Sequence, residues 1–209
     1  KNLNFPADKP VWTQEDSAPP WWVQFDLGTE FIYRSGNNPA DIIVWARLPM
    51  ILLLVFFGWF LFHWARELGG NLVGLGTLAL FAFSPSFIAH GQLVTTDVGA
   101  GLGVALSLYF WLKFLKKPNP TNVFWAGIFF GTAMLMKFSL ILLIPLFGML
   151  CVIYPFLLER DRIAHLKKYI LKALIAGAVG LFLVIWPIYQ FHVAEYPADH
   201  QVRDTAADL

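Results

Sequence analysis

Residues 48–64 read LPMILLLVFFGWFLFHW and contain no aspartate, glutamate, lysine or arginine. Crossing the hydrocarbon core of a bilayer takes roughly 20 apolar residues, with a range of about 17 to 25. A run of this length and composition therefore predicts a transmembrane helix. Arg47 stands directly before the run and Arg66 follows it, at positions where charged side chains can reach the lipid headgroups.

Further apolar runs follow along the chain, and each is bounded by charged or polar residues. They predict spans over residues 72–89, 98–115, 123–136, 139–158 and 173–191. The run at 123–136 is short, so we expect a tilted or interrupted helix there. The predicted fold is therefore all-α, a polytopic transmembrane helix bundle of about six spans. It divides the chain into a juxtamembrane segment over residues 1–41, the bundle over 42–194 and a polar tail over 195–209.

The overall composition agrees with a membrane protein. Of the 209 residues, 57% are hydrophobic and only 14% are charged, and the mean hydropathy is +0.59. A soluble domain has about 25% charged residues. This composition excludes a disordered chain and a disulfide-rich scaffold, and the net charge of +1 argues against a nucleic acid partner. The one cysteine, Cys151, cannot form an internal disulfide.

Lysine and arginine gather on one side of the predicted bundle, and this asymmetry predicts its orientation. Short loops that are rich in these residues stay in the cytoplasm. The juxtamembrane segment and the polar tail then lie on the outer side of the membrane. The basic side holds Arg66, Lys113, Lys116, Lys117, Arg160, Arg162, Lys167, Lys168 and Lys172.

The polar stretch SPSFIAHGQLVTTD, residues 84–97, joins the second and third predicted spans on the outer side. It ends at Asp97, which opens a span with no further charge before Lys113. One interpretation is a helix cap, because an aspartate accepts hydrogen bonds from the first free amides and is favoured by the helix dipole. The other is an acid that faces an active-site cleft, because ionisable groups at membrane boundaries are often functional. Both can hold together.

Lys137 is a second candidate, because it separates two apolar runs on the outer side and runs against the basic asymmetry. It can be a lysine whose stem is buried while its ammonium reaches the headgroups. Alternatively, it is a cation that holds the phosphate of a lipid-linked substrate. Arg47, at the start of the first span on the same side, invites the same two interpretations.

His90 can be a ligand, a proton shuttle or an interfacial histidine. No second histidine stands at ligand spacing, so we expect no metal site at His90. We also expect no cofactor, and a divalent metal ion is the alternative that stays open. The spacing of Gly127 and Gly131, and of Gly70 and Gly74, predicts faces for close helix packing.

Several stretches together resemble a known family. They are GNNPADIIVWARLPMILL at 36–53, FHWARELGG at 62–70, AHGQLVTTDVGAGLGVALSLYFWLKFLKKP at 89–118 and WAGIFFGTAMLMKFSLILLIP at 125–145. They resemble bacterial members of the dolichyl-phosphate-mannose–protein mannosyltransferase superfamily. These are membrane glycosyltransferases of the GT-C fold, related to family 39 and to the aminoarabinose transferases of lipid A.

The resemblance implies a multi-pass protein of the bacterial inner membrane with its active face outside. It implies that a sugar passes from a polyprenyl-phosphate donor to a hydroxyl of a protein or glycolipid acceptor, with inversion and with help from a carboxylate. Asp97 matches the acid that opens a family helix, and Lys137 matches a basic residue near the lipid phosphate. Arg47 matches an arginine that precedes a family helix. His90 lies in the family's AHG segment and is the second catalytic candidate, without an assigned role.

The chain also departs from the family pattern. Family members begin with an additional span, followed outside by an acidic motif thought to supply the catalytic base. Asp8, Glu15 and Asp16 do not match that motif. We therefore expect this chain to be a fragment that is inactive alone, with the catalytic base in the missing segment.

Two other classes of function stay open from the sequence. A transporter or channel would carry ionisable groups near the membrane midplane and discontinuous helices. A non-catalytic membrane subunit would explain the missing acidic motif. The candidate residues lie instead at predicted span ends, which favours chemistry on a lipid headgroup.

Overall fold

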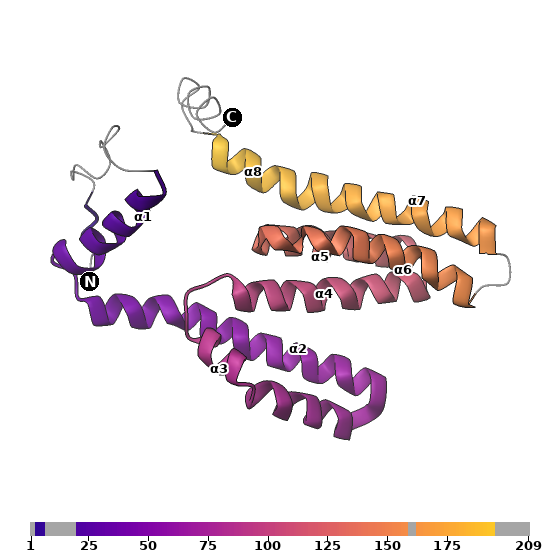
Figure 1. The fold of residues 1–209 in the computed structure, drawn as a ribbon, viewed down its shortest axis with the longest axis horizontal. Helices are drawn as coiled ribbons and strands as arrows, with labels where there is room; N and C mark the ends of the chain where they lie inside the picture. Colours follow the sequence, from indigo (N-terminus) through magenta and orange to yellow (C-terminus); the bar gives the residue numbers. More distant parts are fainter. Residues whose placement is uncertain (1–2, 7–19, 159–161, 195–209) are drawn as a thin grey trace.

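The computed structural model describes residues 3–6, 20–158 and 162–194, without the side chains of 20–24, 158 and 162–164. This described part is built from helices and contains no strand, so the predicted all-α fold is confirmed (Figure 1). The predicted tail at 195–209, the acids Asp8, Glu15 and Asp16, and Arg160 lie outside the described residues. The helical segments are α1 Pro20–Thr29, η2 Glu30–Arg34, α2 Pro39–Ala82, α3 Pro85–Gly91, α4 Asp97–Lys116, α5 Pro120–Met136, η3 Phe138–Leu142, α6 Leu143–Leu158, α7 Arg162–Gly180, η4 Leu181–Ile185 and α8 Trp186–Val193.

Helix α2 has 44 residues and is a hairpin of two helices rather than a single rod. At about 1.5 Å per residue, a straight helix of this length would be about twice as long as the membrane is thick. The chain turns at Gly69 and Gly70, and Gly70 has φ 80° and ψ −175°, a conformation that suits glycine. Gly74 then packs against Phe62 and Arg66 of the preceding half. The first two predicted spans form the two arms of this hairpin (Figure 1).

The second predicted span, 72–89, is wrong in its last part. Helix α2 ends at Ala82, and α3 begins separately at Pro85. Proline lacks a backbone N–H and disfavours a helical conformation in the residue before it. Ser84 accordingly has φ −69° and ψ 120°, in the extended region. The chain therefore leaves the helix before the apolar run ends.

The remaining helices pack side by side as a bundle, in which α5 lies against both α4 and α7, and α6 lies against α7 (Figure 1). Segments α7, η4 and α8 continue one another from residue 162 to residue 193. Within the described residues, four helices are long and apolar enough to cross a membrane: Pro39–Ala82, Asp97–Lys116, Phe138–Leu157 and His165–Val193. Helix α2 supplies two crossings because it is a hairpin, and α5, with 17 residues, is nearly long enough for another. The helices therefore agree approximately with the predicted number of spans.

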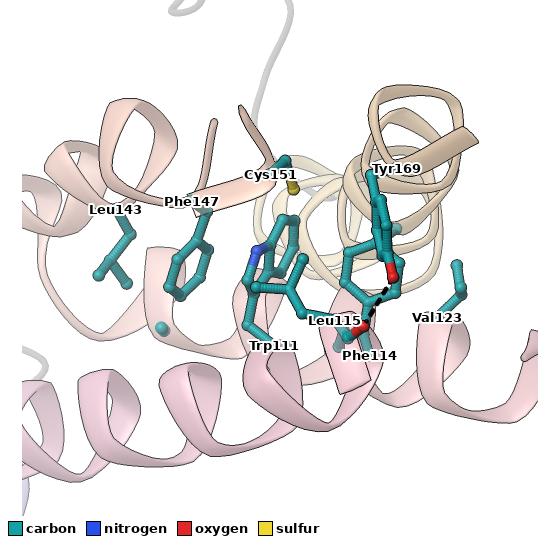
Figure 2. Packing of buried hydrophobic residues seen from close by; sticks show 11 residues of the cluster. Trp111, Phe114, Leu115, Val123, Leu143, Phe147, Cys151 and Tyr169 are labelled. Carbon is teal, nitrogen blue, oxygen red and sulfur yellow. Dashed lines mark hydrogen bonds between the residues drawn. The ribbon is translucent and has the colours of Figure 1, made fainter. Parts of the chain in front are cut away.

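An aromatic cluster holds α4, α6 and α7 together (Figure 2). The indole of Trp111 stacks on the ring of Phe147 with 4.4 Å between ring centroids. The hydroxyl of Tyr169 donates a hydrogen bond of 3.0 Å to the carbonyl of Leu115. Phe114 and Cys151 are buried in the same cluster. This cluster fixes α4, whose first residue is the candidate acid.

Small residues allow α5 and α7 to approach closely. A Cβ atom added at Gly131 would lie 2.7 Å from the carbonyl oxygen of Gly180. Gly127 faces the backbone of Ala176 in the same way. The predicted packing face of Gly127 and Gly131 is therefore confirmed.

The bundle has two chemically different ends. The end where α4 begins is called the Asp97 end, and the end where α4 finishes is called the Lys116 end. At the Lys116 end, the hydroxyl of Tyr109 donates to the carboxylate of Glu67 at 2.9 Å and receives a contact from the ammonium of Lys113. The predicted gathering of basic residues matches this end, which holds Arg66, Lys113, Lys116, Lys117, Lys167, Lys168 and Lys172.

Candidate functional site

Asp97 is the first residue of α4, and its carboxylate pairs with a lysine instead of capping the helix. The helix cap is Thr96, and its side chain makes no capping hydrogen bond. The Oδ1 atom of Asp97 lies 2.7 Å from the Nζ atom of Lys137. The simple capping interpretation therefore does not describe this side chain.

Lys137 stands at the break between α5 and η3. Its backbone is extended, with φ −159° and ψ 134°, so the chain leaves the α5 helix at this residue. The break directs the chain away from the helix axis just where the apolar run is interrupted. The paired ammonium also departs from the headgroup interpretation, which gives Lys137 no protein partner.

Close packing of α4 against α5 brings the two charges together. A Cβ atom at Gly103 would lie 3.2 Å from the Cα atom of Ala133. One turn earlier, a Cβ atom at Gly99 would lie 3.3 Å from the sulfur of Met136. These contacts set an antiparallel register in which the start of α4 lies opposite the end of α5. Asp97 and Lys137 meet as a consequence.

A buried hydroxyl fixes this register further along the helices. The Oγ atom of Ser107 on α4 donates a hydrogen bond of 2.8 Å to the carbonyl of Phe129 on α5. Ser107 is fully buried, so the bond is made where water cannot compete. The register at the Asp97 end therefore does not depend on the ion pair itself.

His90 joins the pair from the short helix α3. Its Nδ1 atom lies 3.6 Å from Oδ2 of Asp97, which is ion-pair distance but longer than a hydrogen bond. Helix α3 is held by Phe87, which packs on Phe81 with 4.3 Å between ring centroids, and by Gly91, which contacts Leu54. Side chains from α3, α4 and the α5–η3 junction thus converge on one carboxylate.

The three side chains are open to a ligand. The exposed fraction is 41% for Asp97, 44% for Lys137 and 50% for His90. Ion pairs with this exposure contribute only about 0–1 kcal/mol to stability. The pair is therefore accessible, and it can be exchanged for other contacts at a small cost in stability.

Arg47 lies at the same end but outside this cluster. It stands one heptad before Leu54, on the face of α2 that packs on α3 and α4. Seven residues of helix place Arg47 about 10 Å beyond Leu54 along the axis of α2. The first turns of α2 extend beyond the start of α4 (Figure 1). Among the residues that the structure describes, no ion pair or hydrogen bond reaches the guanidinium of Arg47. The structure therefore brings Asp97, His90 and Lys137 together and leaves Arg47 apart.

An apolar groove lies between α5 and the η4–α8 segment, and its residues were not candidates from the sequence. Its volume is about 460 Å³, and one wall includes Met136, the residue before Lys137. His192 and Tyr189 give the groove a polar rim. Both residues stand at the end of the last apolar run, which is the only signal that the sequence offered. The lining residues are Thr132, Leu135, Met136, Val184, Ile188, Tyr189 and His192.

The described residues contain no group of three or more histidine, cysteine, aspartate or glutamate side chains that could hold a metal ion. Within that part of the chain, Asp97 and His90 lack a third such neighbour. The chemistry available from the described cluster is therefore that of one carboxylate, one ammonium and one imidazole.

The sequence model of a family described as dolichyl-phosphate-mannose-protein mannosyltransferase matches residues 41–189. The match covers more than half of the chain and includes Arg47, His90, Asp97 and Lys137. No curated protein and no solved structure matches the chain.

Proposed function

The chain belongs to the dolichyl-phosphate-mannose-protein mannosyltransferase family, and we propose that its Asp97 end binds a sugar linked to a polyprenyl phosphate and supports transfer of that sugar to an acceptor hydroxyl. Family membership and the long apolar helices make the chain an integral, multi-pass membrane protein of the membrane glycosyltransferase type. The donor, the acceptor and the side of the membrane belong to the proposal.

The meeting of Lys137 with Asp97, directly after a residue that lines an apolar groove, is the observation that carries the proposal. A polyprenyl phosphate has an anionic head and a long apolar tail. An ammonium group donates up to three hydrogen bonds, and its bonds to phosphate oxygens are strengthened by charge. The groove beside Met136 offers an apolar surface for the first isoprene units. Head and tail would thus find complementary surfaces side by side.

Asp97 is the carboxylate of this cluster that can assist the reaction. In an inverting transfer, the acceptor oxygen forms a bond to the anomeric carbon while the bond from that carbon to the phosphate oxygen breaks. The bonding electrons leave with the phosphate, and the acceptor proton passes to a base. A positioned carboxylate is a suitable base, so this proposal places the base on Asp97 and not on the acidic motif that the family resemblance implies. His90 can orient Asp97, because its Nδ1 atom lies 3.6 Å from Oδ2.

Two features support chemistry on a lipid headgroup at the outer face of the membrane. The cluster stands at helix ends, whereas a transporter would need ionisable groups near the midplane. The basic residues gather at the opposite end, and basic loops stay in the cytoplasm. The Asp97 end then faces outward, which in a bacterial cell is the outer side of the inner membrane.

Donor affinity of Lys137 variants tests the proposal. Charge-assisted contacts contribute about 1.5–3 kcal/mol, so Lys137→Gln should weaken binding of a polyprenyl phosphate roughly ten- to a hundredfold. Lys137→Arg should lose less, because it keeps the charge but changes the donor geometry. Affinity is measured in nanodiscs, with Lys116→Gln at the opposite end as the matched control. Equal affinity for the wild type and both variants of Lys137 would remove this lysine from the site and leave Arg47 as the next candidate.

A further inference from the structure

We infer that Asp97 occupies the phosphate position on Lys137 in the donor-free protein, and that the donor phosphate displaces it on binding. The inference rests on the proposed function, because it takes Lys137 as the ligand of the phosphate. It adds an exchange of anions on one ammonium, which couples donor binding to the release of the carboxylate.

The first support is the geometry of the resting pair. The distance of 2.7 Å from Nζ of Lys137 to Oδ1 of Asp97 is that of a full charge-assisted hydrogen bond. Within the described ranges, Lys137 forms no ion pair with any other residue. The cation that would hold the phosphate therefore already carries an anionic occupant from its own chain.

The second support is the charge of the two anions. A carboxylate and a phosphate on one ammonium would lie only a few ångströms apart, and their like charges would repel each other. Their repulsion is strong at such distances, because the effective dielectric constant near a protein surface is far below that of water. The donor phosphate is a diester with one negative charge, as a carboxylate has, so neither anion can bind beside the other on the ammonium without this repulsion. Displacement of Asp97 by the phosphate is therefore favoured over a complex in which Lys137 holds both anions.

The third support is that the displaced carboxylate has somewhere to go. His90 Nδ1 already lies 3.6 Å from the second oxygen of Asp97. The first amides of α4 are also close, because Asp97 is the first residue of that helix and the side chain of Thr96 leaves them uncapped. A small rotation of the Asp97 side chain exchanges Lys137 for these weaker partners. The carboxylate then remains at the site and is free to accept a proton.

This exchange sets an order of events. While Lys137 holds Asp97, the carboxylate is a poor acceptor for the proton of a hydroxyl. Donor binding frees the carboxylate at the moment when a sugar is present. The acceptor hydroxyl is therefore activated after the donor has bound, and not before.

The test measures binding of farnesyl phosphate to the full chain in nanodiscs, with farnesol as the phosphate-free control ligand. Asp97→Asn should bind farnesyl phosphate about fivefold more tightly than the wild type, because a neutral amide no longer competes for Lys137. Lys137→Gln should bind it more weakly. In the Lys137→Gln background, Asp97→Asn should give a much smaller gain, and this difference measures the coupling between the two residues. Farnesol should bind equally to all variants.

Two results would overturn the exchange while leaving the phosphate site intact. One is unchanged or weaker binding in Asp97→Asn while Lys137→Gln still loses affinity, which would mean that Lys137 holds both anions together. The other is an equal gain from Asp97→Asn in both backgrounds, which would mean that Asp97 only repels the phosphate through space. Binding that does not depend on Lys137 would instead overturn the proposed function and the exchange with it. Asp97→Ser is the second neutral variant, should the asparagine form fail to fold.

Discussion

At the scale of single residues, the contact between Asp97 and Lys137 was beyond what the sequence could predict. The sequence placed both on one side of the membrane, but 40 residues separate them. None of the interpretations of Asp97 or Lys137 paired these two side chains with each other. The contact depends on the approach of α4 to α5 over Gly99 and Gly103, which is a property of two helices together.

The role of Asp97 leads to a prediction for sugar transfer. Asp97→Asn should reduce sugar transfer by about a hundredfold or more, because general base catalysis contributes about 10²–10⁴. Asparagine is also a good capping residue, so a role at the helix end alone predicts little loss. The measurement is transfer from a polyprenyl-phosphate-linked sugar by purified enzyme, with the maximal rate falling while donor affinity does not weaken.

Glu67→Gln supplies the matched control, because the carboxylate of Glu67 lies at the Lys116 end and bonds to Tyr109. It should leave the transfer rate unchanged. A wild-type rate for Asp97→Asn would remove Asp97 from the chemistry.

At the scale of helices, hydropathy predicted the crossing segments but not their breaks. A window of apolar residues measures burial in lipid, and it does not detect where a helix ends inside the run. The signal for the end of the second span was present in Pro85, since proline disfavours the helix before it. Gly70 and Gly74 were predicted to share a packing face, yet only Gly74 packs, while Gly70 makes the turn.

The contact between α5 and α7 leads to a prediction about stability. Gly131→Ala should destabilise the chain by about 1–3 kcal/mol, because its new methyl group meets backbone atoms of Gly180 that cannot move aside. Gly177→Ala is the matched control on α7, since a Cβ atom there meets nothing within 4 Å. The control should be neutral or slightly stabilising, because alanine favours a helix over glycine.

Unfolding in mixed detergent micelles measures both glycine variants. Equal stability for Gly131→Ala and the wild type would show that α5 and α7 do not approach closely at this glycine. A large loss in Gly177→Ala would show that its side of α7 is covered by another part of the protein.

At the scale of the whole molecule, the distribution of exposed side chains follows from the bilayer as solvent. Leu72, Phe83 and Phe138 are 84%, 82% and 86% exposed, which would be costly in water but not in lipid. The same principle made the fold class predictable, because composition alone separates a lipid-facing bundle from a soluble domain. The arrangement of the helices was less predictable, because lipid-facing residues do not specify which helices become neighbours.

The separation of charge between the two ends predicts the orientation of the molecule. The Lys116 end should face the cytoplasm, and the Asp97 end should face the opposite side. Single cysteines at Gln92 and Lys116, both exposed, test this in a Cys151→Ser background. An impermeant thiol reagent added outside intact cells should label the cysteine at Gln92, and label the cysteine at Lys116 only after the membrane is opened. Cys151 itself is buried, so its replacement removes background labelling from unfolded chains without exposing a new surface. Labelling of the cysteine at Lys116 in intact cells would show the opposite orientation, with the Asp97 cluster on the cytoplasmic side of the membrane.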